Sequence, residues 1–170
     1  MAKSPNKPSV TEKDPFDRMR ANWTVITAHR PVIQQRGEMN CGPACAEMLF
    51  ADRGRAIDQV LIADGLYLAH GVRAPELADK MNECTDIVWD GGVLESSASY
   101  VLMQRANRHG TWAALLLPNG PNHVGHWVVV DNIYPDSVVV RDPVGQAFRI
   151  PIGDFVQLWF HTALVTEEKP

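Results

Sequence analysis

Cys41 lies in a sequence context that favours a reactive thiolate. It is followed by Gly42 and Pro43 and then by apolar residues at helical spacing, which predict a helix over about residues 42–51. Proline suits the first turn of a helix, where its missing N–H costs nothing. The unpaired backbone N–H groups and the positive end of the helix dipole at that point stabilise a negative charge. Because such an environment lowers a thiol pKa, Cys41 is the candidate nucleophile.

His126 and Asp142 are the candidate base and the group that orients it. Both belong to β-rich runs that flank a turn at Tyr134. In a hairpin centred on Tyr134, His126 pairs with Asp142, and both side chains lie on one face of neighbouring strands. The carboxylate can then bond one imidazole nitrogen while the other faces a thiol. A slip of one residue would separate them, and the alternative for Asp142 is a turn residue before Pro143.

Other titratable residues fit these roles less well. His123 lies in a loop and has no facing carboxylate at matching parity, and Asp131 faces away from His126 on the same strand. Cys45 follows Cys41 by one helical turn, but two further ligands at metal-site spacing are absent, so that we expect a core thiol and no metal site. Cys84 is expected to be structural. The remaining histidines are expected to lie at the surface or to cap helices, and they are His29, His70, His109 and His161.

The order of the predicted elements indicates an α+β fold. Helical patterns cover about residues 42–51, 56–69, 75–84, 95–108 and 154–159. Strand patterns cover residues 23–27, 111–117, 126–133, 137–141, 146–150 and 161–165, and Gly91-Gly92 is predicted as a turn. Helices followed by antiparallel strands predict a helical N-terminal lobe and a sheet lobe, with the active site in the cleft between them.

The composition is that of an ordinary globular protein. The chain has 170 residues, of which 45% are hydrophobic and 21% charged, which indicates a single domain with a substantial core. A net charge of -4 argues against a nucleic-acid binder. The longest apolar runs, such as 112–117, are too short to span a membrane. Three cysteines favour a reducing compartment over a disulfide framework.

The first residues differ in composition from the rest. Residues 1–22 are polar and contain three prolines, Pro5, Pro8 and Pro15, among lysine, aspartate and glutamate residues. This composition predicts a flexible leader or linker, with the globular domain over 23–170.

These motifs together resemble the papain-like cysteine peptidases, and within them most closely the double-glycine-leader peptidases that process bacteriocins. That family has a glutamine six residues before Cys-Gly, then a histidine, and an Asp-Pro or Asn-Pro about sixteen residues later. Here Gln35 precedes Cys41 by six residues, and Asp142-Pro143 follows His126 by sixteen. The resemblance covers roughly residues 30–165, and it implies a papain-like fold.

The resemblance also implies a role for each matching residue. Cys41 would be the nucleophile, His126 the general base and acid, and Asp142 its orienter. The side-chain amide of Gln35 and the backbone N–H of Cys41 would form the oxyanion hole, and spacing favours Gln35 over its neighbour Gln34. No cofactor is implied.

The expected function is a cysteine endopeptidase that acts on protein or peptide substrates, with a preference for small residues such as Gly-Gly before the cut. No transporter follows the domain in this sequence, which favours a bacterial toxin module that acts in the cytoplasm after secretion and has a cognate immunity protein. A second hypothesis keeps the triad but makes the chain a deamidase, transglutaminase or acyltransferase. A third is a binding module on the same scaffold.

Overall fold

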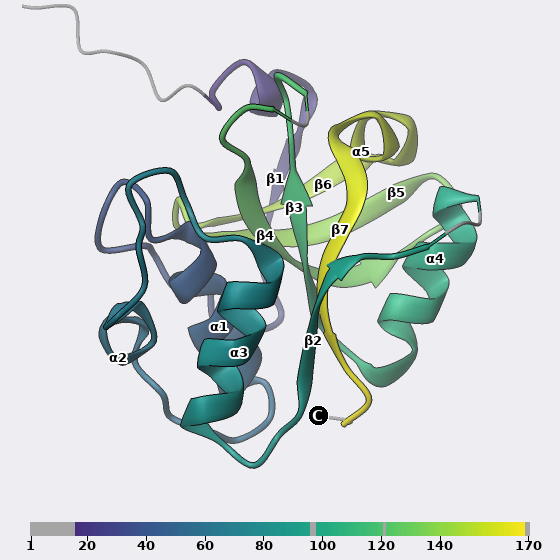
Figure 1. Cartoon of the computed structure of the whole chain (residues 1–170). Helices are drawn as coiled ribbons and strands as arrows, with labels where there is room; N and C mark the ends of the chain where they lie inside the picture. Colours follow the sequence, from purple (N-terminus) through teal and green to yellow (C-terminus); the bar gives the residue numbers. More distant parts are fainter. Residues whose placement is uncertain (1–15, 96–97, 121, 169–170) are drawn as a thin grey trace, which may run out of the picture.

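The computed structural model describes residues 16–95, 98–120 and 122–168, and one antiparallel sheet runs through this part of the chain (Figure 1). Its strands are β1 (Thr24–Ile26), β2 (Trp89–Val93), β3 (Trp112–Leu116), β4 (His126–Ile133), β5 (Ser137–Asp142), β6 (Gln146–Pro151) and β7 (Trp159–Thr166). They are arranged in the order β1-β6-β5-β4-β3-β7-β2, and all the pairings are antiparallel. Strand β3 and residues 126–130 of β4 are almost fully buried, because apolar side chains lie on both faces of the sheet there.

Helices cover both faces of the sheet. They are α1 (Cys41–Ala51), α2 (Gln59–Ala63), α3 (Ala74–Cys84), α4 (Ser99–Ala106) and α5 (Ile152–Leu158), with 3-10 helices η1 (Met19–Asn22) and η2 (Asn107–His109). One core cluster joins α1 and α3 to Trp127 and Val129 of β4. A second cluster joins α4 and α5 to Val128 and Val130 of the same strand. The alternation of faces along β4 therefore separates two cores, with α1, α2 and α3 together on one side (Figure 1).

The predicted α+β class is confirmed, and two local predictions are wrong. The helix expected over 56–69 is only the short α2, which is followed by a turn that includes Gly65 with φ 79°. The Gly91-Gly92 pair lies inside β2 and pairs with β7, whereas the sequence suggested a turn. A Cβ atom on Gly91 would lie 2.0 Å from the carbonyl oxygen of Ala74. The glycine is required there because the start of α3 packs directly on the strand.

Residues 16–22 lie against the domain, although the sequence suggested a leader up to residue 22. Met19 packs against the second core cluster, together with the buried Trp23 that follows η1. Residues 1–15 of the expected leader lie outside the described residues. None of the described helices combines the length and the apolar character that a membrane crossing requires.

Candidate active site

Cys41 is the first residue of α1 and is buried where this helix begins. Small residues at the start of the helix allow it to approach the chain around Val72 closely. A Cβ atom on Gly42 would lie 2.4 Å from Cγ1 of Val72 and 3.3 Å from Leu77 and Trp127. The N-terminal turn of α1 therefore fits beneath these side chains only with glycine at position 42.

His126 is the first residue of β4 and faces the carboxylate of Asp142. Its Nε2 lies 2.7 Å from Oδ1 of Asp142. A carboxylate oxygen only accepts, so that Nε2 carries the proton in this contact. Nδ1 is then the nitrogen available to Cys41, whose side chain forms a hydrogen bond with that of His126. The structure thus brings together three of the four predicted site residues in the expected order.

Asp142 ends β5 and is fully buried. Besides His126, its Oδ1 accepts the backbone N–H of Val144 at 2.9 Å, and Gly145 closes the turn through the Asp142 carbonyl at 3.0 Å. Asp142 therefore both orients His126 and acts as a turn residue before Pro143, which the sequence presented as alternatives. The same carboxylate shapes the turn before β6 and holds the imidazole.

The strand register that unites His126 and Asp142 differs from the predicted one. The turn is centred between Pro135 and Asp136, because Ile133 pairs with Val138. This offset alone would place the two side chains on opposite faces. A bulge after Val130 inserts one extra residue into β4, after which Val130 pairs with Val140 and the original parity returns. His126 and Asp142 are therefore diagonal neighbours on one face, not a directly opposed pair.

The charges of the three side chains favour a thiolate–imidazolium pair. Burial raises the pKa of Cys41, but the hydrogen bond and the charge of His126, with the backbone N–H groups of Trp127 and Gly42, lower that pKa below its ordinary value. Burial lowers the pKa of His126, but hydrogen bonds to Asp142 and Cys41 outweigh it and raise the pKa to about 9. The pKa of Asp142 is lowered, against the effect of burial, by His126 and then by Arg20.

The side chain of Gln35 is directed at its own loop. Its Nε2 donates to the carbonyl oxygens of Gly37 at 2.7 Å and Glu38 at 3.0 Å, so that both amide hydrogens are used. The backbone N–H of Gln35 donates to the carbonyl oxygen of Pro143 at 2.8 Å, which ties this loop to the turn after Asp142. Its amide is thus held within the loop that leads to Cys41.

Arg20 and Phe16 also contact the triad, which the sequence did not predict. Arg20 Nε donates to Oδ2 of Asp142 at 2.8 Å, and the ring of Phe16 lies 4.8 Å from the ring of His126. One signal could have indicated a packed segment. Phe16, Met19 and Trp23 are spaced three and four residues apart, as in an apolar helical stripe.

Cys45, His123 and Asp131 lie where the sequence suggests. Cys45 is fully buried, and its burial raises its pKa well above that of a free thiol. His123 lies at the edge of the cavity described below. Asp131 bonds Arg141 at 2.9 Å and not His126.

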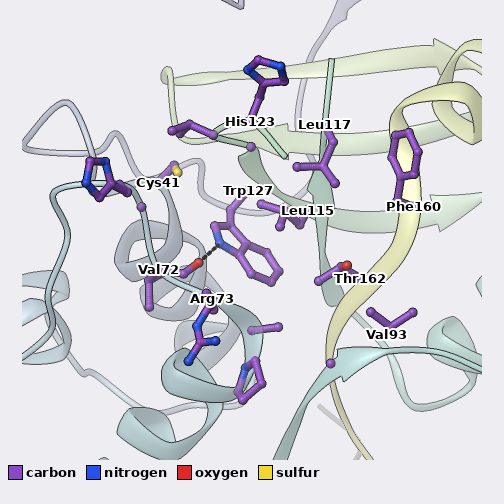
Figure 2. Close-up of a pocket in the computed structure, with 17 residues that line it drawn as sticks. Cys41, Val72, Arg73, Val93, Leu115, Leu117, His123, Trp127, Phe160 and Thr162 are labelled. Carbon is purple, nitrogen blue, oxygen red and sulfur yellow. Dashed lines mark hydrogen bonds between the residues drawn. The ribbon is translucent and has the colours of Figure 1, made fainter. Parts of the chain in front are cut away.

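A cavity of about 480 Å³ opens beside Cys41 (Figure 2). Its lining is mainly apolar and includes Val72, Leu115 and Trp127, with Phe160 at the far side. The indole N–H of Trp127 donates to the carbonyl oxygen of Val72 at 3.0 Å, which holds the two residues together next to the thiol. An extended peptide could reach Cys41 along this cavity.

Comparison with known proteins identifies one relative by sequence. Cysteine protease effector 1 of Escherichia coli O1:K1:H7 is 32% identical over 142 residues, which are 81% of this chain and 27% of the relative. The chain thus spans about a quarter of the length of the curated relative that it matches. No family model matches the chain.

Several solved structures share its fold, and among them are two peptidases from transporters. The peptidase domain of Streptococcus ComA, a bi-functional ABC transporter involved in quorum sensing, has a TM-score of 0.67 at 13% identity, and the match covers 83% of this chain and 100% of that one. A double-glycine-motif protease from an AMS/PCAT transporter, solved with a leader peptide, has a TM-score of 0.61 at 18% identity, with 83% and 95% covered. The chain has the fold of these peptidase domains, and the resemblance to papain-like cysteine peptidases that its sequence predicts is confirmed.

Proposed function

We propose that this chain is a cysteine endopeptidase domain with Cys41 as nucleophile, His126 as general base and acid, and Asp142 as the residue that orients His126. The observation that carries the proposal is the buried Cys41–His126–Asp142 array, in which the thiol pKa is lowered and the imidazole pKa is raised to about 9. Such an array places a thiolate nucleophile and a protonated imidazole next to the cavity in which we expect a peptide to bind.

The arrangement supports acyl transfer in two steps. The Cys41 thiolate attacks a peptide carbonyl carbon, and His126 transfers its proton to the leaving amine as the C–N bond breaks. Water, which gives a proton to His126, then attacks the thioester and releases the carboxylic acid product and the Cys41 thiolate, so that the thiolate–imidazolium pair is restored. Throughout, Asp142 keeps Nε2 of the ring in place through the 2.7 Å contact.

The oxyanion would be held by the backbone N–H of Cys41 and the amide of Gln35. Both hydrogens of that amide now donate to loop carbonyls, so that this role requires the side chain to turn from Gly37 or Glu38 toward the substrate. Replacement of Gln35 by glutamate removes the donor, and we expect a loss in kcat of roughly 10²- to 10³-fold.

A preference for small residues before the cut is the finer part of the proposal. Val72 and Trp127 are bulky and are held together by a hydrogen bond beside Cys41, so that we expect them to disfavour large side chains next to the attacked carbonyl. The double-glycine-motif protease found among the solved structures has the same fold. Gly-Gly before the cut is therefore the substrate class that we propose.

We further propose that the domain acts as a toxin in the cytoplasm of a target bacterium, with an immunity protein that binds it in the producing cell. The name of the Escherichia coli relative, an effector, supports this role. An inhibitor that covers the cavity next to Cys41 would block the substrate path.

The test compares the wild type with Cys41→Ala in a bacterial proteome. We expect new N-termini preceded by small residues in the wild-type sample and none in the Cys41→Ala sample. A gain of about 1 Da at glutamine, or an amine adduct, with no new termini would instead indicate deamidation or transamidation by the same acyl-enzyme. New termini that persist with Cys41→Ala would refute the assignment of the nucleophile.

A further inference from the structure

Asp142 has donors on both of its carboxylate oxygens, and one of these donors is a side chain from outside the predicted triad. Oδ1 accepts from Nε2 of His126 and from the backbone N–H of Val144, at 2.7 and 2.9 Å. Oδ2 accepts from Nε of Arg20 at 2.8 Å. A buried carboxylate oxygen without a hydrogen-bond donor costs free energy. Arg20 supplies the donor for Oδ2, whereas His126 and Val144 both bond Oδ1.

The position of Arg20 also restricts how the carboxylate can rotate. The two donors on Oδ1 restrain the carboxylate plane through that one oxygen and leave Oδ2 without a partner. Arg20 adds a contact to Oδ2 and a longer one, at 3.4 Å, from Nη2 to Oδ1. A planar guanidinium that reaches both oxygens fixes the plane, and with it the direction in which Oδ1 faces His126.

The segment that carries Arg20 approaches from the side away from the cavity. Met19 and Trp23 pack in the second core cluster, whereas Cys41 belongs to the first. The ring of Phe16 lies on the ring of His126 at an angle of 32°. The cavity beside Cys41 has no lining from residues 16–20 among the described residues. The segment therefore contacts the His126–Asp142 pair on the side opposite the cavity and does not block the path of a substrate to Cys41.

We propose that Arg20 is a positioning residue. It fixes the orientation of the Asp142 carboxylate and keeps this group charged, and Asp142 in turn keeps His126 directed at Cys41. The proposal rests on the peptidase function proposed above. It extends the working site to a segment that the sequence assigns to a leader. Phe16 contributes by covering the His126 ring on the same side.

The charged groups around Asp142 define the expected effect of pH. They are His126 on β4, Cys41 and the buried thiol of Cys45 on α1, and Arg20. Nη2 of Arg20 also lies 3.2 Å from Nε2 of His126, and its Nη1 lies 3.9 Å from Asp17. Arg141 precedes Asp142 but bonds Asp131 and Asp52 on the other face. Arg20 lowers the pKa of Asp142, so that removal of the Arg20 guanidinium makes this carboxylate easier to protonate. At acid pH the protonated Asp142 would no longer stabilise the charged form of His126.

The test uses Arg20→Met and Arg20→Lys, which have similar length but differ in charge. The measurements are the rate of Cys41 alkylation by iodoacetamide from pH 4 to 10, and kcat and KM on a cleaved peptide. For Arg20→Met we expect the acid limb to move up by about one pH unit. We also expect kcat to fall roughly 10- to 100-fold while KM changes less than about twofold.

Arg20→Lys is expected to keep the wild-type acid limb because it restores the charge, and to recover only part of the lost kcat because an ammonium group does not reach both oxygens as the guanidinium does. Arg18→Met, an exposed change in the same segment, is the matched control and should behave as the wild type. Arg20→Gln replaces Arg20→Met if the latter melts below the assay temperature. The proposal would be overturned if Arg20→Lys and the uncharged variant had the same pH profile of Cys41 alkylation. It would also be overturned if the uncharged variant had the wild-type profile.

The two proposals can fail separately. If the wild type cleaves no peptide, the endopeptidase function fails. Alkylation of Cys41 requires no peptide substrate, and the comparison of its pH profile between variants still decides the role of Arg20.

Discussion

Asp142→Asn separates the charge of this residue from its shape. An asparagine oxygen can still accept from Nε2 of His126 at the same place, while the negative charge is lost. Arg20 would then lie beside His126, with Nη2 3.2 Å from Nε2, without the carboxylate that neutralises both. We therefore expect the imidazolium form of His126 to become much less stable without a change in the position of the ring.

The size of the effect follows from the pKa of His126. In the wild type, hydrogen bonds and charges of Asp142 and Cys41 outweigh burial and raise this pKa from 6.5 to about 9. A change of this size corresponds to about 3 kcal/mol. Asp142→Asn removes the larger contributor, so that we expect the pKa to fall by about 2 pH units. At pH 8 the imidazolium fraction would then drop from about 0.9 to about 0.1.

The folded state is affected in a defined pH window. Because the folded-state pKa of His126 is raised, the stabilisation that it brings is present below pH 6.5 and is lost as the pH rises through about 9. The deficit in unfolding free energy of Asp142→Asn should accordingly be largest near pH 6 and should shrink toward pH 10.

The assay is an NMR titration of the His126 ring in the wild type, in Asp142→Asn and in Asp136→Asn. Asp136 lies exposed in the turn between β4 and β5, and its replacement should leave the titration unchanged. A His126 pKa that stays near 9 in Asp142→Asn would refute the view that the carboxylate charge stabilises the imidazolium.

Two predictions concern the framework of the site. Gly91→Ala places a Cβ atom 2.0 Å from the Ala74 carbonyl and should destabilise the protein by roughly 1–3 kcal/mol in chemical unfolding, whereas Gly92→Ala, with open space around it, should stay within about 0.5 kcal/mol. Arg141→Met leaves the buried carboxylates of Asp131 and Asp52 without their shared cation and should cost about 3–5 kcal/mol, against little for Arg36→Met at an exposed ion pair; equal losses would contradict this reasoning.

The pairing of His126 with Asp142 could be predicted from parity, although the register itself could not. Alternation along two β-rich runs determines which residues share a face. The place of the turn and the bulge after Val130 depend on contacts between distant parts of the chain. Arg141, for example, bonds Asp131 but also Asp52 and the carbonyl of Pro31, far from the hairpin in sequence.

The supporting segment could not be predicted for the same reason. Arg20 and Asp142 are separated by 122 positions, and nothing local to either residue indicates that they meet. Polar residues and prolines dominate the first twenty residues, and this composition predicts a flexible segment. The helical spacing of Phe16, Met19 and Trp23, which indicates a packed segment, is not evident from composition alone. The helix around Cys41 was predictable because its signals, Gly42 and Pro43, are adjacent to the functional residue.

The proposed peptidase function requires a thiolate at position 41 near neutral pH. The direct measurement is the pH dependence of the rate at which iodoacetamide alkylates Cys41 in the wild-type protein, followed by mass spectrometry of the modified peptide. We predict rapid alkylation well below pH 9, with most of the rise in rate complete before His126 loses its proton near pH 9, and protection of the buried Cys45. A single rise in rate centred at or above pH 9, as for an ordinary thiol, would contradict it.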